Sequence, residues 1–174
     1  MLKEEFPRVE TVNPTVKDPD FSKGGVVCCT VKAPKELEFP VLPYKDPESR
    51  KLLFPLGVFS GTWTYPELRL ALANGYQIQK IHDAIEYEMQ PSPFAGYIKF
   101  LYDLRMSYKG RDELMVYTLK IAMNSTFGKF GEEGELQVIS RGVRHTLSQT
   151  PAHSNMIWAS YILAYGRIAL YRYM

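Results

Sequence analysis

The residues best suited to chemistry lie between positions 120 and 130, where a lysine, an asparagine and an aromatic ring recur at helical spacing. At about 100° per residue, Lys120, Asn124 and Phe127 fall on one face of a helix. An ammonium group pairs with phosphate, an amide bonds to phosphate or sugar oxygens, and a ring lies against a sugar or base. This stripe predicts a nucleotide clamp. The alternative is a solvated Lys120 and a core Phe127.

A second pair of cations, Arg105 and Lys109, is spaced four residues apart and shares a helix face. A hairpin that turns near residue 110 puts Arg105 opposite position 116, so Lys120 lies only about four residues, roughly 6 Å of helix, deeper. Three converging cations suit a triphosphate, whose charge needs fixed positive groups. Solvated cations on the two helix faces are the alternative.

The elements that position these residues are two helices. Apolar spacing predicts one helix from Phe94 and a second from Leu114 to about Phe127, before the glycines at 128, 131 and 134. The link at 109–112 makes the pair an antiparallel helical hairpin over residues 93–128.

The first third of the chain predicts strands and turns. The β-branched run at 26–31 indicates a buried strand, and the closely spaced prolines at 40–55 allow only loops and short extended pieces. Cys28 and Cys29 lie in that run on opposite faces and are expected to be small buried hydrophobes.

A short helix is expected at 65–73. Thr64 and Glu67 fit a capping box, in which the threonine hydroxyl accepts from the N–H of Glu67, and Asn74-Gly75 ends the helix. Residues 76–88 predict a strand with a bulge near Asp83.

The last third predicts a strand pair and a helix. Strands are expected at 136–139 and 143–147 around Arg141-Gly142, and the apolar pattern of 151–174 predicts a helix buried on most faces. The predicted fold class is therefore α+β, with short antiparallel strands, a helical hairpin and a buried C-terminal helix.

Composition sets broad limits. The 174 residues are 45% apolar with a net charge of +2, which fits one domain or a large piece of one and permits a polyanionic partner without requiring it. No run approaches the roughly 18 apolar residues of a membrane span, and the charged start is not a secretory signal. We expect a soluble, intracellular protein without a membrane partner.

The motifs together resemble a known family. Lys120-x-x-x-Asn124-Ser125-x-Phe127-Gly128 resembles the B motif of family B DNA polymerases, usually Lys-x-x-x-Asn-Ser-x-Tyr-Gly, and the trailing Gly128-Lys129-Phe130 resembles the protein-primed subgroup of phages, viruses and linear plasmids. Arg105 and Lys109 resemble the phosphate-binding pair of the first fingers helix. Residues 59–68 and 74–76 resemble the palm before the fingers, and 163–167 resembles a Thr-x-x-(Gly or Ala)-Arg element.

The resemblance implies a fold and roles. Residues 1–92 would be partial palm, 93–128 the fingers hairpin and 129–174 the return to the palm. The nucleotide would meet Arg105, Lys109, Lys120, Asn124 and Phe127, and DNA would meet Lys129, Gly166 and Arg167. The implied partners are primer-template DNA, deoxynucleoside triphosphates and a terminal protein primer, and a phage or viral parent would act in the host cytoplasm.

Two residues depart from the family pattern. Phe127 replaces the usual tyrosine, so steric sugar discrimination could survive while a hydrogen bond is lost. Leu163 replaces the usual threonine, which leaves Arg167 as the main implied primer contact.

The metal-binding aspartates of the family have no counterpart here. Neither Asp-x-x-Ser-Leu-Tyr-Pro nor Tyr-x-Asp-Thr-Asp-Ser occurs, although residues 1–3 and 170–174 resemble sequence beside them. Two-metal phosphoryl transfer needs such carboxylates, so Mg²⁺ is expected only in a complete parent enzyme, and this chain alone is expected to be inactive. The alternatives are a non-catalytic nucleic-acid-binding module derived from a polymerase and a purely structural helical hairpin.

Overall fold

The computed structural model describes residues 4–14, 16–132, 134–140, 143–149 and 154–174. The predicted turn at Arg141-Gly142 and the start of the C-terminal segment at Pro151 lie outside the described residues, as do residues 1–3. The chain forms two compact units, one of residues 3–92 with 163–174 and one of residues 93–162. The boundary between the two units at residues 162 and 163 falls inside helix α4 (Met156–Tyr171).

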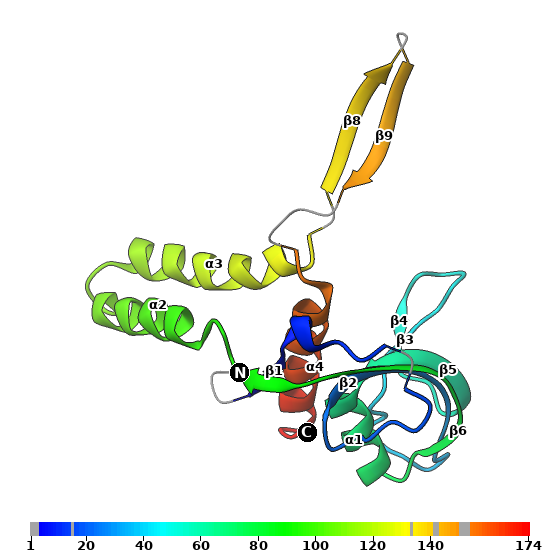
Figure 1. Ribbon diagram of the computed structural model, residues 1–174. Coiled ribbons are helices and arrows are strands. Elements are labelled where there is room, and N and C mark those ends of the chain that lie inside the picture. The colour runs from blue at the N-terminus through cyan, green and yellow to red at the C-terminus, as the bar shows by residue number, and fades with distance from the viewer. Residues whose placement is uncertain (1–3, 15, 133, 141–142, 150–153) are drawn as a thin grey trace. The chain divides into compact units, whose positions relative to one another are not determined.

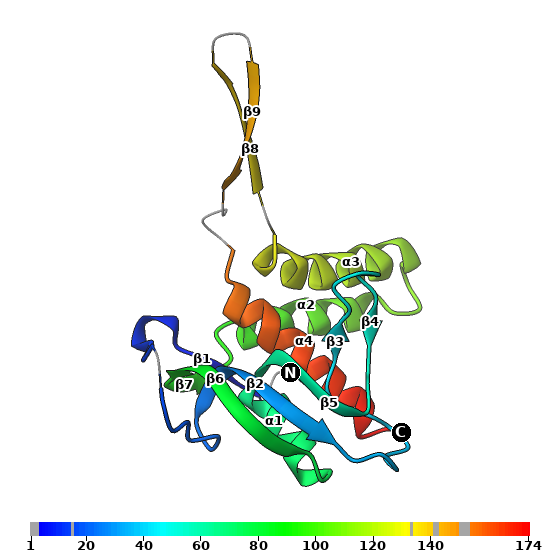
Figure 2. The same ribbon diagram turned by 90° about the vertical axis from the view of Figure 1, so that its right-hand side faces the viewer.

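A three-stranded antiparallel sheet forms the framework of the first unit. Strand β2 (Gly24–Ala33) lies between β5 (Gly57–Thr64) and β6 (Gln77–Tyr87), and helix α1 (Tyr65–Ala73) covers one face (Figures 1 and 2). Along β2, alternate side chains point into the core, because successive residues of a strand face opposite ways. The buried core includes Val27, Cys29, Val31, Leu42, Trp63, Tyr65, Leu68 and Tyr76.

The strand expected at 76–88 and its bulge near Asp83 are confirmed. Cys28 pairs with Asp83 and Cys29 with Ile81, so His82 is the extra residue of the bulge. The cysteines face opposite sides as predicted, but only Cys29 is fully buried and Cys28 is partly exposed, so the expectation of two buried hydrophobes was half wrong.

Short elements complete the first unit. Strand β1 (Glu5–Pro7) pairs with β7 (Met89–Pro91), β3 (Tyr44–Lys45) pairs with β4 (Leu52–Leu53), and a 3-10 turn covers Val9–Thr11. The 34–56 stretch therefore holds only short extended pieces, as its prolines predict.

Helix α1 begins and ends where the sequence predicts, but the capping box was wrong. Thr64 is the N-cap residue, yet its side chain makes no cap hydrogen bond and instead donates to Oε2 of Glu67 at 3.0 Å. The reason is that the Glu67 carboxylate is buried and takes the hydroxyl as a donor. At the other end Gly75 has φ of 84°, the left-handed conformation that glycine adopts without strain.

The second unit contains the predicted helical hairpin. Helix α2 (Ala95–Tyr108) and helix α3 (Glu113–Phe130) pack antiparallel across a turn in which Gly110 has φ of 76° (Figure 1). Asp112 caps α3 by accepting from the N–H of Met115 at 3.0 Å. Helix α3 passes through Gly128 and ends at Phe130, so the expected end at Phe127 was too early.

Strands β8 (Gly134–Ser140) and β9 (Val143–Gln149) form the expected antiparallel pair. The C-terminal helix α4 is not buried on most faces. Tyr161, Ala164 and Ile168 are buried, but Met156, Leu163 and Leu170 are more than half exposed. These exposed residues are spaced seven apart, so they form one apolar stripe along the helix.

The α+β class is confirmed, with small antiparallel sheets and helices. The division into palm and fingers at 1–92, 93–128 and 129–174 stays a prediction. Among the described residues, no helix is long and apolar enough to span a bilayer.

Candidate functional site

The predicted nucleotide-binding residues all lie on the α2–α3 hairpin. Lys120 and Asn124 are exposed, while Phe127 is partly buried beside the face that packs against the rest of the unit. On a helical projection at about 100° per residue, Lys120 and Phe127 lie within about 20° of each other, at one margin of the face centred on buried Leu119. The charged and aromatic members of the stripe therefore face the same way, about two helical turns apart, and the exposed Lys120 can meet a ligand.

The Phe127 ring is held by other aromatic rings. It packs edge-on against Phe94, with ring centroids 6.3 Å apart and an interplanar angle of 74°. Phe94 is buried and also packs against Phe130 and Trp158 at 5.5 and 6.0 Å. The pairs of Phe94 with Phe127 and with Trp158 are edge-to-face, which is favourable because the positive ring edge meets a negative ring face. The cluster fixes the position of the Phe127 ring, on the same side of α3 as Lys120.

The cations of α2 differ in their surroundings. Arg105 is partly buried, and its Nε is enclosed without a hydrogen-bond partner among the described residues. Lys109 is exposed and is the C-cap residue of α2. Within the described part of the chain, no carboxylate pairs with Arg105, Lys109 or Lys120, whereas Lys99 pairs with Asp103 on the same hairpin. Three uncompensated positive charges on one helical pair favour an anionic ligand.

Lys129, at the end of α3, differs from these three cations because it has a carboxylate partner. Its Nζ lies 2.7 Å from Oε2 of Glu132, in a largely exposed i,i+3 ion pair. An exposed pair of this kind contributes little and breaks readily, so the predicted DNA contact of Lys129 stays open.

The second predicted site, Gly166-Arg167, belongs to the first unit. Nε of Arg167 donates to Oε1 of Glu67 at 2.7 Å, and the side chain of Glu67 is only 4% exposed. The sequence pattern did not find this partner, because Glu67 reads there as a local capping residue. A glutamate is rarely fully buried without a partner, so the burial of Glu67 is the signal that indicates a distant cation.

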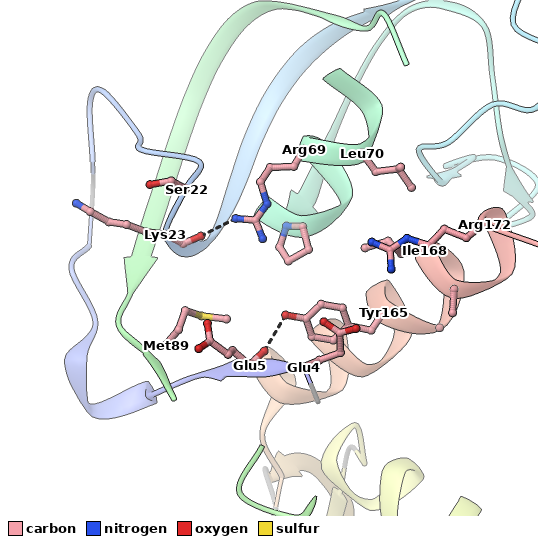
Figure 3. Close-up of a pocket in the computed structure, with 13 residues that line it drawn as sticks. Glu4, Glu5, Ser22, Lys23, Arg69, Leu70, Met89, Tyr165, Ile168 and Arg172 are labelled. Atoms are coloured by element: carbon pink, nitrogen blue, oxygen red, sulfur yellow. Dashed lines mark hydrogen bonds between the residues drawn. The ribbon is translucent and has the colours of Figure 1, made fainter. Parts of the chain in front are cut away.

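Gly166 lines a cleft of about 500 Å³ between α1, β1 and the end of α4 (Figure 3). Arg69 of α1 and Arg172 also line it, and Nη1 of Arg69 donates to the carbonyl oxygens of Phe21 and Lys23 at 2.6 and 3.1 Å. Tyr165 donates its hydroxyl hydrogen to the carbonyl oxygen of Glu5 at 2.7 Å. Burial raises the pKa of Tyr165 to about 12, so it stays a neutral donor.

The described residues do not fit a metal centre. Nowhere among them do three His, Cys, Asp or Glu side chains come together as ligands would. We therefore assign no metal ligand within this chain and derive no step through a metal ion.

Comparison with known proteins decides the family. Residues 1–140 match the family described as "DNA polymerase type B, organellar and viral". The chain belongs to this family. The resemblance that the sequence motifs indicate is thereby confirmed.

Two relatives of this type B polymerase chain are each named "Probable DNA polymerase". The one from Neurospora intermedia is 33% identical over 109 residues, which is 60% of this chain and 11% of the relative. The one from Ascobolus immersus is 34% identical over 109 residues, which is 62% of this chain and 9% of the relative. The chain thus spans about a tenth of the curated relatives that it matches.

Solved structures of Phi29 DNA polymerase share the fold. The orthorhombic crystal form matches 95% of this chain and 32% of the Phi29 chain, with a TM-score of 0.65 and 13% identity. The ternary complex with primer-template DNA and incoming nucleotide substrates matches 96% of this chain and 32% of the Phi29 chain, with a TM-score of 0.63 and 14% identity. At this identity the likeness concerns the fold.

Proposed function

We propose that this chain is the part of a template-directed, protein-primed DNA polymerase that binds the incoming deoxynucleoside triphosphate and primer-template DNA. The observation that carries the proposal is that Arg105, Lys109 and Lys120, on the α2–α3 hairpin of a type B polymerase chain, have no carboxylate partner among the described residues. Terminal protein as a primer and Mg²⁺ as the metal belong to the complete parent enzyme in this proposal.

Helix geometry supports convergence of these cations. Arg105 lies about 40° from buried Leu101 around α2, and Lys120 lies about 100° from buried Leu119 around α3, in the same rotational sense. The two helices run in opposite directions. Rotations of the same sense, measured from Leu101 on one helix and Leu119 on the other, therefore bring Arg105 and Lys120 to the same side of the hairpin. Arginine and lysine side chains are long enough to reach one triphosphate from these positions.

The remaining residues have distinct roles in the proposal. Lys120, Arg105 and Lys109 bind phosphate oxygens through charge-assisted hydrogen bonds, and Asn124 positions the nucleotide through its amide. Phe127, held by the ring of Phe94, lies beside the sugar and excludes a 2′-hydroxyl by its bulk. Arg167 contacts the primer strand, and Gly166 and Lys129 lie along the DNA.

The test is binding of a fluorescent deoxynucleoside triphosphate to the purified chain. Lys120→Ala is expected to weaken binding by about tenfold, since a charge-assisted hydrogen bond contributes about 1.5–3 kcal/mol and each 1.4 kcal/mol is tenfold. Lys99→Ala is the matched control, because Lys99 is an exposed lysine of the same hairpin that already pairs with Asp103.

The ligand series separates this proposal from general attraction to anions. Triphosphate is expected to bind more tightly than the corresponding monophosphate, and only triphosphate binding should depend on Lys120. Equal effects of Lys120→Ala and Lys99→Ala, or no effect of either, would favour the purely structural hairpin instead.

A further inference from the structure

A buried carboxylate joins helix α1 to the C-terminal part of helix α4. Oε1 of Glu67 accepts from Nε of Arg167 at 2.7 Å, and Oε2 accepts from the hydroxyl of Thr64 at 3.0 Å. The side chain of Glu67 is 4% exposed, whereas that of Arg167 is 30% exposed. The acid is thus the enclosed end of the pair and the guanidinium is the end that reaches the surface.

The geometry of this pair fixes the guanidinium plane. Arginine has five N–H donors in a rigid planar fork, and the bond to Glu67 uses the single one on Nε. The four N–H donors on the two terminal nitrogens have no partner in the part of the chain that the structure describes, and are left for other groups. Since the other oxygen of Glu67 is held by Thr64, the carboxylate itself cannot rotate freely, and the direction of the fork follows from its position.

The arrangement of Glu67 and Arg167 is better suited to binding a phosphate of a DNA strand than to stabilising the fold. Burying a carboxylate and a guanidinium carries a desolvation penalty, so a pair of this kind is often no more stabilising than apolar residues of the same volume. A planar fork with free terminal donors matches the geometry of two phosphate oxygens. Orientation of Arg167 is therefore the property that the pair secures.

We propose that Glu67 is a positioning residue, which orients Arg167 so that its terminal nitrogens meet a phosphate of the primer strand. This inference rests on the proposed function, in which Arg167 contacts primer-template DNA. Glu67 itself touches no DNA and acts only through Arg167 and its anchor Thr64.

Whether substitution of Glu67 raises or lowers the affinity for DNA distinguishes a positioning role from a general electrostatic effect. Glu67→Leu removes a negative charge, so non-specific attraction to DNA would become stronger. If Glu67 orients Arg167, the same substitution weakens binding. We expect Glu67→Leu to lower the affinity for a fluorescein-labelled duplex with a recessed 3′ primer end by about as much as Arg167→Ala, about tenfold.

Two further measurements test the same positioning role. The double variant Glu67→Leu with Arg167→Ala should bind no more weakly than either single variant, because both remove the same contact. Arg167→Ala should also lower the slope of log affinity against log salt by about one, the loss of one phosphate contact. A merely structural pair would leave that slope unchanged.

Glu86→Leu is the matched control. Glu86 is the other buried glutamate described in this unit, it pairs with Lys23 at 3.3 Å, and its loss changes the net charge equally. It should not weaken DNA binding. Should Glu67→Leu fail to fold, Glu67→Gln keeps the shape and an acceptor oxygen without the charge, and an intermediate loss of affinity is expected.

The outcomes distinguish this inference from the proposed function. If Arg167→Ala leaves DNA binding unchanged, the DNA role of Arg167 is wrong and the inference fails with it. If Arg167→Ala weakens binding while Glu67→Leu and Glu67→Gln leave it unchanged or tighter, the DNA role stands and only the positioning role of Glu67 is wrong.

Discussion

The hydroxyl of Tyr171 donates a hydrogen bond to Oδ1 of Asn74 at 2.8 Å, which ties the last turn of α4 to the C-cap residue of α1. The two residues are 97 positions apart in the sequence. Asn74 also donates from Nδ2 to the carbonyl oxygen of Leu70 at 2.8 Å. The same side chain therefore caps the C-terminal end of α1 and accepts the hydrogen bond from α4. This bond and the Glu67–Arg167 pair are two independent links between the same two helices.

Tyr171→Phe removes only the hydroxyl of this link. We expect it to lower the free energy of unfolding by about 0.5–1.5 kcal/mol, the net contribution of one intramolecular hydrogen bond. Urea titration followed by circular dichroism measures the change. Tyr173→Phe is the control, since Tyr173 is 91% exposed and its loss should change little; equal effects would mean that the Asn74 bond contributes nothing.

The adjacent cysteines should differ sharply in reactivity. Burial raises the pKa of Cys29 to about 12, while Cys28 is partly exposed on the other face of β2. Because the thiolate is the reactive form, one thiol per native chain should react with Ellman's reagent at pH 8, and both should react in denaturant. Labelling of Cys28→Ala tests the assignment, and rapid native reaction in that variant would contradict it.

The same shift predicts a pH dependence of stability. The pKa of Cys29 is raised in the folded chain, so an unfolded chain loses this proton first as the pH rises from about 9. The stabilising contribution is complete below that pH and is lost progressively up to about pH 12. Urea midpoints measured between pH 8 and pH 11 should fall, and a smaller fall is expected in Cys29→Ala.

Two glycines should respond to alanine with opposite signs. Gly75 has φ of 84° and a Cβ there would lie 3.3 Å from Cγ of Pro34, so Gly75→Ala should destabilise by about 1 kcal/mol. Gly96 lies in the first turn of α2 with open space around its Cα, and Gly96→Ala should stabilise by up to about 1 kcal/mol. Thermal midpoints of the two variants, measured side by side, give both signs, and a stabilised Gly75→Ala would exclude the strained turn.

The purified chain is expected not to extend a primer on a template with Mg²⁺. Two-metal phosphoryl transfer needs clustered carboxylates, and the two aspartate motifs of the family do not occur in this sequence. Incorporation of labelled deoxynucleotide, measured by gel electrophoresis, tests this expectation. Template-dependent extension that survives removal of any contaminating polymerase would contradict it.

The sequence by itself determined the local elements. Helix α1 begins after Thr64 and ends at Asn74-Gly75, and the turn with Gly110 and Asp112 separates α2 from α3. These limits could be predicted because caps and turns depend on residues close together in the chain. The ordered motifs around Lys120 and Asn124 indicated the polymerase family before any comparison, since several spacings must agree at once.

Only the tertiary structure decided which distant side chains meet. Glu67 looked like a capping residue, but the fold brings Arg167 to it from 100 positions away, and a buried acid takes the strongest donor within reach. The end of α3 at Phe130 likewise follows from the packing of that ring on Phe94 and Trp158, which outweighs the helix-ending tendency of Gly128. Local spacing contains no information on such partners, because they depend on how elements pack and not on how they form.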